Sequence, residues 1–392
     1  MTTSTSSLKS GNNKEFNKQN IPELRFPGFK DEWKKRKLIE IGEVQDGSHE
    51  TPQYYETGIP FIRLQNIERN KFIYEDIKYI SQEKAEQLKR HSYQPGDIVF
   101  NKLGNPIGKT AIVPKDIEPG IMVSDVVKIR PNSKINYNFV MEFLNSPRTE
   151  KQIKIEMTGS TRKRLNLGQV KNLRIIIPCR EEQDKLADFM NLLNKKIELM
   201  EKNYHTLDEY STYTRHILFE DISKNYLFYN FEDIFKSVST KQHQIKKSEI
   251  KNEGKIPVID QGKKLIAGYS NDEKYILKNK GIILFGDHTT IIKFIDYDFI
   301  VGADGVKLLM PCNNKNNIKF LYYALKEYNI SAEGYKRHFS ILKQIELPIP
   351  SIDIQNKIEK LLSNLDMKKF LLQNEIDRTK EFKKSLLSKM FC

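Results

Sequence analysis

The sequence predicts an α+β protein in which two small mixed α/β domains alternate with two long helices. Three observations predict it: a tandem repeat, a coiled-coil seam that repeats with it, and short runs of β-branched and aromatic residues between Gly, Pro and Asn clusters. Such runs are typical of small mixed sheets. A chain of 392 residues is also too long for one ordinary core.

The repeat is visible without gaps at a shift of 172 residues, which aligns residues 170–178 with 342–350 and Gln183 with Gln355. Weaker pairs keep the same order before it: 59–62 with 256–259, 96–100 with 281–285, and 125–128 with 304–307. Their shift drifts along the chain. The two halves therefore share a framework and differ in loop lengths.

Each repeat ends in a seam of alternating four- and three-residue spacings, the a/d pattern of a coiled coil. The first seam comprises Leu186, Met190, Leu193, Ile197, Met200, Tyr204, Leu207, Ser211, Thr214 and Leu218. The second comprises Ile358, Leu362, Leu365, Lys369, Leu372, Ile376, Thr379, Lys383, Leu386 and Met390. Each helix should run about 35–40 residues, or about 50–60 Å. We expect the two seams to bury each other; the alternative is that each helix packs only on its own domain.

The prolines at 178 and 350 end the strands that precede the long helices, which divides the chain. We expect a disordered polar tail over residues 1–20, a first domain over 21–178, its helix over 179–220, a second domain over 221–350 and its helix over 351–392. Shorter helices are predicted at 83–90, 138–144 and 320–328.

The chain carries 65 Lys and Arg against 51 Asp and Glu, a formal net charge of +14. This excess favours an anionic partner such as nucleic acid, although a Lys-rich genome would produce the same bias. No apolar run approaches the ~20 residues that span a bilayer, and no secretory segment opens the chain. Cys179, Cys312 and Cys392 are too far apart for a zinc site or a disulfide framework, so a cytoplasmic location is expected.

The loop before the last strand of each domain is rich in hydrogen-bond donors. Its candidates for nucleic-acid contact are Thr161, Arg162, Lys163 and Arg164 in the first domain, and Tyr335, Lys336, Arg337 and His338 in the second. Arg can donate two hydrogen bonds to guanine in the major groove, whereas Lys more often meets phosphate. The alternative for either loop alone is a solvated charged turn.

Two further loops in each repeat carry donors behind apolar strands. One supplies Lys102, Asn105 and Lys109, and in the second repeat His288 and Thr289. The other supplies Arg63, Gln65 and Asn66, and in the second repeat Lys263, Lys264 and, further on, Tyr269. Asn and Gln can bond both polar groups on the major-groove edge of adenine, and Tyr269 could stack or bond a phosphate.

Two segments imitate motifs of other chemistry. Residues 104–110 look like a phosphate-binding loop, but three residues instead of four separate the first Gly from the Gly-Lys pair. The Asp287–His288 pair has no Ser or Cys nucleophile at a recognised spacing. Motifs of amino-methyltransferases, glycine-rich cofactor loops and two-metal nucleases are not evident either. We therefore assign this chain no catalytic residue, metal ligand or cofactor.

Three features in combination resemble the specificity subunit of type I restriction–modification systems, over nearly the whole chain after about residue 20. Residues 22–29 read PELRFPGF with Trp33 just after them. An Ile-Pro pair precedes Gln183 and Gln355 at the two long helices. The segment FGDHT at 285–289, followed by GADGVK at 302–307, is similar to one recurrent type of target-recognition domain.

The resemblance implies that each domain recognises one half of a bipartite, asymmetric target in double-stranded DNA, and that the helices pack antiparallel and set the spacer. It implies two methylation subunits as partners and, in some complexes, two restriction/translocase subunits. Those partners would bind S-adenosylmethionine, ATP and Mg²⁺, and would methylate an adenine flipped out of the duplex. The chain itself would be a non-catalytic subunit.

Two other functions remain open from the residues alone. A DNA-cutting or DNA-modifying enzyme with its own active site would act on DNA without partners. An assembly scaffold, whose charge only keeps it in solution, would show no sequence preference in its contacts with DNA.

Overall fold

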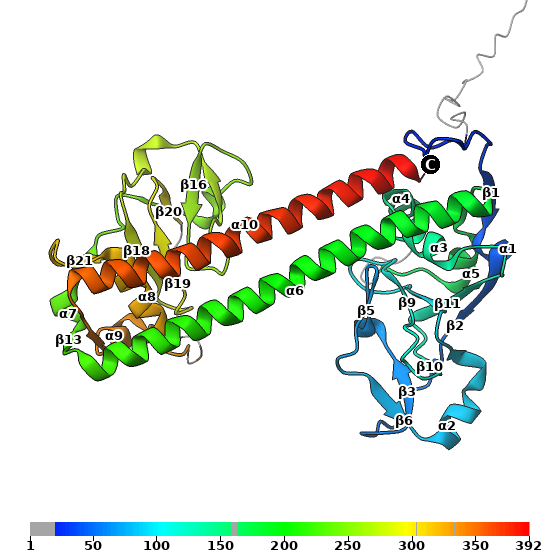
Figure 1. Cartoon of the computed structure of the whole chain (residues 1–392), viewed down its shortest axis with the longest axis horizontal. Helices are drawn as coiled ribbons and strands as arrows, with labels where there is room; N and C mark the ends of the chain where they lie inside the picture. Colours follow the sequence, from blue (N-terminus) through cyan, green and yellow to red (C-terminus); the bar gives the residue numbers. More distant parts are fainter. Residues whose placement is uncertain (1–19, 158–162, 303, 333, 335, 392) are drawn as a thin grey trace, which may run out of the picture. The chain divides into compact units, whose positions relative to one another are not determined.

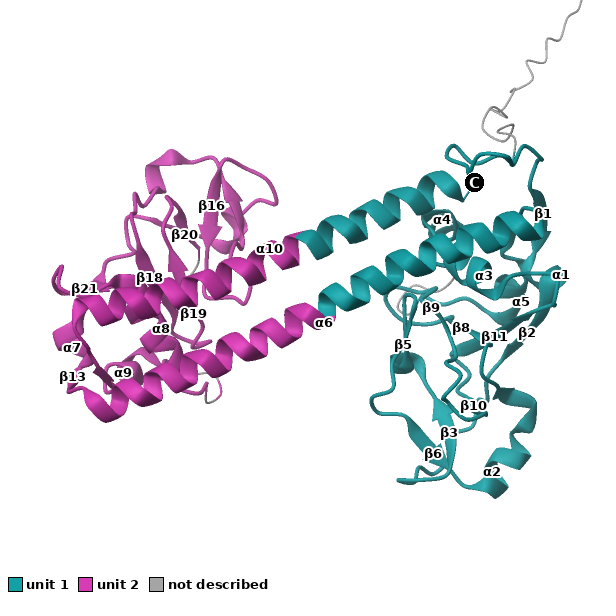
Figure 2. Cartoon of the chain, viewed as in Figure 1, with its two compact units in different colours: residues 1–201, 375–392 teal, residues 202–374 magenta. Residues whose placement is uncertain are grey.

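The computed structural model describes residues 20–157, 163–302, 304–332, 334 and 336–391. They form two compact units (Figure 2): unit 1 comprises residues 1–201 and 375–392, and unit 2 comprises residues 202–374. Except for Asn20, the tail expected over residues 1–20 lies outside the described residues. Each unit contains one domain together with parts of both long helices, α6 (Arg180–Asn225) and α10 (Ile352–Met390).

The first domain, blue to cyan in Figure 1, contains two four-stranded sheets. One is antiparallel, in the order β2 (Gly42–Asp46), β11 (Val126–Pro131), β8 (Ile98–Asn101) and β9 (Thr110–Ile112). The other is mixed, in the order β6 (Lys78–Ile80), β3 (Ile59–Ile62), β10 (Gly120–Met122) and β7 (Ser92–Tyr93), with β3 and β10 parallel.

Short elements complete this domain. Its two-stranded sheets pair β1 (Lys34–Lys37) with β12 (Arg174–Ile177), and β4 (Ile67–Glu68) with β5 (Lys71–Phe72). Its helices are α1 (Leu38–Ile41), η1 (Leu64–Asn66), α2 (Gln82–Gln87), η2 (Lys89–His91), α3 (Tyr137–Leu144), α4 (Pro147–Glu156) and α5 (Leu167–Asn172). The helices predicted at 83–90 and 138–144 are confirmed as α2 and α3, although α2 gives way to η2 before residue 90.

The second domain repeats this plan. Its antiparallel sheet has the order β14 (Phe235–Val238), β21 (Val306–Pro311), β18 (Ile282–Gly286) and β19 (Ile292–Ile295). Its mixed sheet has the order β15 (Gln244–Ile245), β20 (Ile300–Gly302), β16 (Ile256–Ile259) and β17 (Gly268–Ser270). The other elements are β13 (Phe228–Asn230) paired with β22 (Glu346–Pro348), α7 (Phe231–Ile234), η3 (Lys247–Glu249), η4 (Glu273–Tyr275), α8 (Ile318–Glu327) and α9 (Phe339–Leu342).

The predicted repeat is confirmed at the level of strand order. The antiparallel sheets correspond strand for strand, and the weak sequence pairs fall on β3 and β16, on β8 and β18, and on β11 and β21. The mixed sheets differ at one edge: β7 is antiparallel to β10, whereas β15 is parallel to β20. The two domains thus take this edge strand from different places in the sequence. This difference is one reason why the shift that aligns the two repeats changes along the chain.

Each domain buries its main core against the long helices of its own unit. In unit 1, Trp33, Phe139 and Phe143 pack with Met190 of α6 and Met390 of α10. In unit 2, Phe285 and Phe320 pack with Phe219 of α6 and with Ile358 and Leu362 of α10. The long helices therefore pack on their domains as well as on each other. Both packing alternatives considered for the seam are thus present together.

Every predicted seam position of α6 and α10 is buried or half-buried. The helices run antiparallel in unit 1, where Glu201 contacts Lys380 at 2.6 Å and Asn194 contacts Lys383 at 2.6 Å. In unit 2, Lys369 at another seam position contacts Asp208 at 3.1 Å. The two lysines of the seam thus have polar partners. Of the described helices, none combines the length and apolar character needed to cross a bilayer.

Candidate nucleic-acid interface

In the first domain, two of the predicted donor-rich loops lie side by side. The backbone N–H of Leu165 donates to the carbonyl of Lys102 at 2.9 Å, and Leu103 forms a β-bridge with Arg164. The loop that follows β8 is thereby joined to the segment that precedes α5. These two contacts hold the described parts of both loops next to each other.

The third loop meets these two at one cleft. The cleft has a volume of about 830 Å³, and its lining includes Leu64, Asn105 and Lys163, one residue from each predicted loop. Arg69 and Lys154 add two further cationic side chains to it. The predicted residues Thr161 and Arg162 lie outside the described residues.

The 63–66 loop is held by an acidic partner. Arg63 Nη2 donates to Asp76 Oδ2 at 2.8 Å, and Gln65 Nε2 donates to the same oxygen at 3.2 Å. Hydrogen bonds from Lys78, Gln65 and Arg63 lower the pKa of Asp76 to about 2. Asn66 is buried, and its side chain bonds the backbone of Arg63, Ile73 and Glu75. Asn66 therefore shapes the loop, while Gln65 is exposed on it.

The cations after β8 also have carboxylate neighbours. Lys102 is buried with its Nζ 3.3 Å from Asp46 Oδ2, and Lys109 Nζ lies 2.5 Å from Glu68 Oε1. Asn105, Lys163 and Arg164 are exposed. Among the predicted residues of the first domain that the structure describes, these three and Gln65 are the exposed ones.

In the second domain, Gln261 joins two of the corresponding loops. Its Oε1 accepts from the backbone N–H of His288 at 3.1 Å, and its backbone carbonyl accepts from Thr289 Oγ1 at 2.7 Å. The 335–338 loop is attached to the same place, since the N–H of His338 donates to the carbonyl of Asp287 at 2.8 Å. The structure therefore brings the same three loops together in both repeats.

The predicted side chains of the second domain differ in exposure. Lys263, Lys264, Lys336 and Arg337 are exposed, His288 and Thr289 are half-buried, and Tyr335 lies outside the described residues. His338 is fully buried, and its Nδ1 contacts the carbonyl of Asp287 at 3.0 Å. Its side chain therefore stabilises the loop from the protein interior. Tyr269 lies on β17, where its backbone exchanges hydrogen bonds with Lys251.

A buried lysine supports the 260–264 loop. Lys293 Nζ donates to the backbone carbonyls of Asp260 at 2.7 Å and Lys264 at 2.5 Å. Burial lowers the pKa of Lys293, and the charge of Asp260 opposes this effect. The ammonium group thus orders the loop that presents Lys263 and Lys264. No cluster of three His, Cys, Asp or Glu side chains suited to a metal ion occurs within the described ranges.

The family model of the type I restriction modification DNA specificity domain matches residues 30–209 and 223–379, which together make up most of the sequence. The chain belongs to this family. The two matched segments coincide with the two repeats, each containing one domain and most of one long helix. The resemblance inferred from residues 22–29 and from the repeated Gln is thereby confirmed.

Several known specificity subunits are similar to this family member. The EcoR124I/EcoR124II specificity subunit of Escherichia coli is 35% identical over 120 residues, 27% of this chain and 30% of that protein. The MjaVIII specificity subunit of Methanocaldococcus jannaschii is 25% identical over 202 residues, 50% of this chain and 46% of that protein. The chain thus matches less than half the length of these curated relatives.

Solved structures share the fold over nearly the whole chain. The S subunit of a type I restriction–modification system from M. genitalium has a TM-score of 0.61 at 17% identity, covering 95% of this chain and 99% of its own. A chain studied for the complex assembly and conformational transition of the type I system has a TM-score of 0.52 at 15% identity, covering 94% and 98%. These likenesses confirm the α+β fold with two long helices.

Four residues of the two loop clusters are not among the predicted site residues. Arg69 and Lys154 line the cleft of the first domain, and Arg69 Nη2 lies 2.5 Å from Glu150. In the second domain, Gln261 connects the loops and Lys307 Nζ lies 4.0 Å from Asp287. Lys154 lies near the end of α4, a few residues before the basic loop in the sequence, so its place in the sequence could have suggested it. The position of Arg69 depends on tertiary packing.

Proposed function

We propose that this chain is the sequence-specific DNA-recognition subunit of a type I restriction–modification complex. Each domain recognises one half of a bipartite target, the helices set the spacer and dock the methylation subunits, and the chain catalyses no reaction. The observation that carries the proposal is the same convergence of three loops in both repeats. Such loops offer Arg, Lys, Asn and Gln to base edges and phosphates.

The two loop clusters present different side chains, so the proposed target is asymmetric. The first cluster exposes Gln65, Asn105 and Arg164, whereas the second exposes Lys263, Lys264 and Arg337. The excess of positive charge would strengthen binding to either strand without selecting bases. Half-site spacing would follow from the length of the helices, as it follows from dimer geometry in other DNA-binding proteins.

Exposed apolar side chains on the long helices support a protein partner that binds twice. Leu199 and Leu371 occupy equivalent repeat positions and are 52% and 59% exposed; Tyr210 and Phe382 are also equivalent and are 58% and 55% exposed. All four directly precede a seam residue, so they lie on the same flank of their helices. Their repetition at equivalent positions of both helices distinguishes them from apolar residues that are exposed singly, and it favours a protein-binding surface.

We assign these surfaces to two copies of a methylation subunit. That subunit would supply S-adenosylmethionine and the adenine chemistry, and an optional pair of restriction/translocase subunits would supply ATP and Mg²⁺ chemistry. A complex of this composition would act on DNA in the cytoplasm.

Exchange of residues 21–178 for the equivalent domain of another specificity subunit tests the recognition proposal. We expect the methylated sequence to change in one half-site and to keep the other half-site, since each domain recognises its half independently. Methylome sequencing of cells carrying either version measures this. A change in both halves, or in neither, would contradict the proposal, as would cutting or methylation of DNA by the purified chain alone.

Charged substitutions on the proposed docking flank of one unit should prevent the binding of one methylation subunit. Leu199→Asp combined with Phe382→Asp places two carboxylates on the exposed apolar flank of unit 1, and we expect loss of one of two bound methylation subunits. Native mass spectrometry of the complex would count them. The matched control is Phe370→Asp, because Phe370 is 60% exposed but follows a seam residue. Full assembly of the double variant would refute the assignment.

A further inference from the structure

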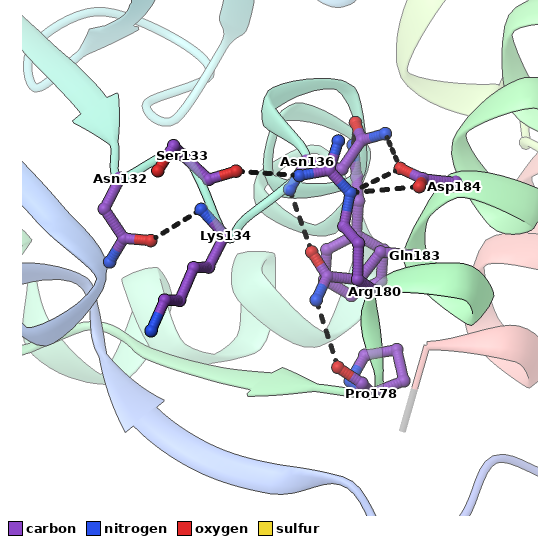
Figure 3. Close-up of polar contacts among 9 residues, drawn as sticks. Asn132, Ser133, Lys134, Asn136, Pro178, Arg180, Gln183 and Asp184 are labelled. Atoms are coloured by element: carbon purple, nitrogen blue, oxygen red, sulfur yellow. Dashed lines mark hydrogen bonds and ion pairs between the residues drawn. The ribbon is translucent and has the colours of Figure 1, made fainter.

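The joint between each domain and its long helix contains a buried glutamine that makes the same two backbone contacts in both units. In unit 1, Gln183 in the first turn of α6 accepts a hydrogen bond from the backbone N–H of Asn136 at 2.9 Å. Its Nε2 donates to the carbonyl of Pro178 at 3.0 Å (Figure 3). One side chain thus connects the end of the last strand, the long helix and the start of α3.

Unit 2 repeats this joint. Gln355 Oε1 accepts from the N–H of Asn317 at 2.9 Å, and its Nε2 donates to the carbonyl of Pro350 at 2.9 Å. The two asparagines are the N-caps of α3 and α8. The Asn and Gln are 47 residues apart in unit 1 and 38 in unit 2. The geometry is therefore the same although the intervening chain differs in length.

A second contact lies beside each glutamine. Asn136 Nδ2 donates to Asp184 Oδ1 at 2.6 Å, and Asn317 Nδ2 donates to Asn356 Oδ1 at 2.9 Å. Figure 3 shows Asp184 between Asn136 and Arg180, whose Nε donates to Asp184 at 2.8 Å. The hydrogen bond from Asn136 lowers the pKa of Asp184, with a further contribution from Arg180 and partial burial acting against it.

The glutamines are 2% and 1% exposed, so water does not replace their hydrogen bonds. Removing either side chain would leave a backbone N–H and a backbone carbonyl without their partner, which is costly in a buried place. The surrounding apolar contacts resist separation of helix and domain, but they are non-directional. The hydrogen bonds of each glutamine are directional and reach two backbone segments of the domain. They can therefore define the angle between the domain and its long helix.

We infer that Gln183 and Gln355 are positioning residues that hold each recognition domain at a fixed angle to its own long helix, so that each glutamine serves one half-site. The inference rests on the proposed function. It adds that the orientation of each loop cluster toward DNA depends on one side chain remote from the loops. It also adds that recognition of the two half-sites can be disturbed separately.

The experiment measures binding of the assembled complex to DNA with both half-sites intact and to DNA altered in either half. The variants are Gln183→Ala and Gln355→Ala in the full chain. The matched control is Gln152→Ala: Gln152 bonds the N–H and the carbonyl of Arg174 at 2.9 Å each, but it joins α4 to β12 within the first domain. Thermal unfolding of each variant is recorded beside binding.

For Gln183→Ala we expect discrimination at the first half-site to fall about ten-fold, which corresponds to ~1.4 kcal/mol, with the second half-site unchanged. Gln355→Ala should give the reverse pattern, and Gln152→Ala should leave both unchanged. A folded Gln183→Ala complex that weakens both half-sites equally, or neither, overturns the inference. Domain exchange identifies the half-sites independently, so its failure would count against the proposed function and not against the joint alone.

Asp184→Ala provides a milder variant in case the alanine at 183 prevents folding. It removes the outer bond to Asn136 from a partly exposed position where alanine favours the helix. We expect the same half-site to lose discrimination by a smaller factor, and Asn356→Ala to affect the other. Equal effects of Asp184→Ala on both half-sites would also overturn the inference.

Discussion

Replacing Lys383 with Met is expected to lower the free energy of unfolding by about 3–5 kcal/mol, because it leaves a buried carboxylate without its cation. Lys383 is 7% exposed, and its Nζ lies 3.0 Å from Oε2 of Glu142, which is fully buried. The ammonium also donates to Asn194 at 2.6 Å and to Asn70 at 3.1 Å. It therefore joins α10 to α3, to α6 and to the turn after β4.

Two further variants make this prediction specific. Lys389→Met removes an exposed lysine from the same helix and should change stability by at most about 0.5 kcal/mol. Glu142→Leu combined with Lys383→Met removes both charges and should recover more than half of the loss, since a buried pair can often be replaced by apolar residues. Chemical denaturation measures all three. If Lys383→Met alone were as stable as the parent protein, the carboxylate of Glu142 would not need the lysine as its partner.

Glu182→Ala is expected to cost a similar amount, about 3–5 kcal/mol, because Arg25 would lose its carboxylate partner. Glu182 is 1% exposed. Its two oxygens accept from Arg25 Nε and Nη2 at 2.7 Å each, and Oε2 also accepts from Trp33 Nε1 at 3.1 Å. The hydrogen bond with Glu182 raises the pKa of Arg25 against the opposing effect of burial.

The neighbouring residue supplies the control. Glu181 lies in the same first turn of α6 but is exposed, so Glu181→Ala should change the free energy of unfolding by at most about 0.5 kcal/mol. Denaturant unfolding of the two variants side by side measures the difference. Equal stabilities would show that the segment around Arg25 is held without the hydrogen bonds to Glu182. The expected result would give residues 22–33 a structural role in attaching this segment to α6.

The repeat, the seam and the three loops of each domain could be predicted because they depend on spacing along the chain. Gln183 and Gln355 also stood out, since the 172-residue shift superimposes them. What each of these glutamines contacts could not be predicted, because Asn136 and Asn317 lie at different distances in sequence. Contacts between distant segments follow from tertiary packing, which a spacing pattern does not contain.

Burial separated residues that looked equivalent in the sequence. Asn66 and His338 stand in donor-rich loops, yet both are buried and bond their own backbone surroundings. Lys383 is a charged residue in a largely apolar seam, and a carboxylate from α3 accompanies it. In each case the polar composition of the segment did not reveal which side chain is buried. Packing against a neighbouring element determines that.

The last turn of α10 lies in the core of the first domain. Phe391 stacks on Phe139 with ring centroids 5.5 Å apart, and Leu386 and Met390 pack in the same cluster. During translation, these residues leave the ribosome only after all of unit 2 has been synthesised. Until then the nascent first domain carries an uncovered apolar face, which favours aggregation or chaperone binding. Prematurely terminated chains would keep that face exposed and become substrates for proteolysis.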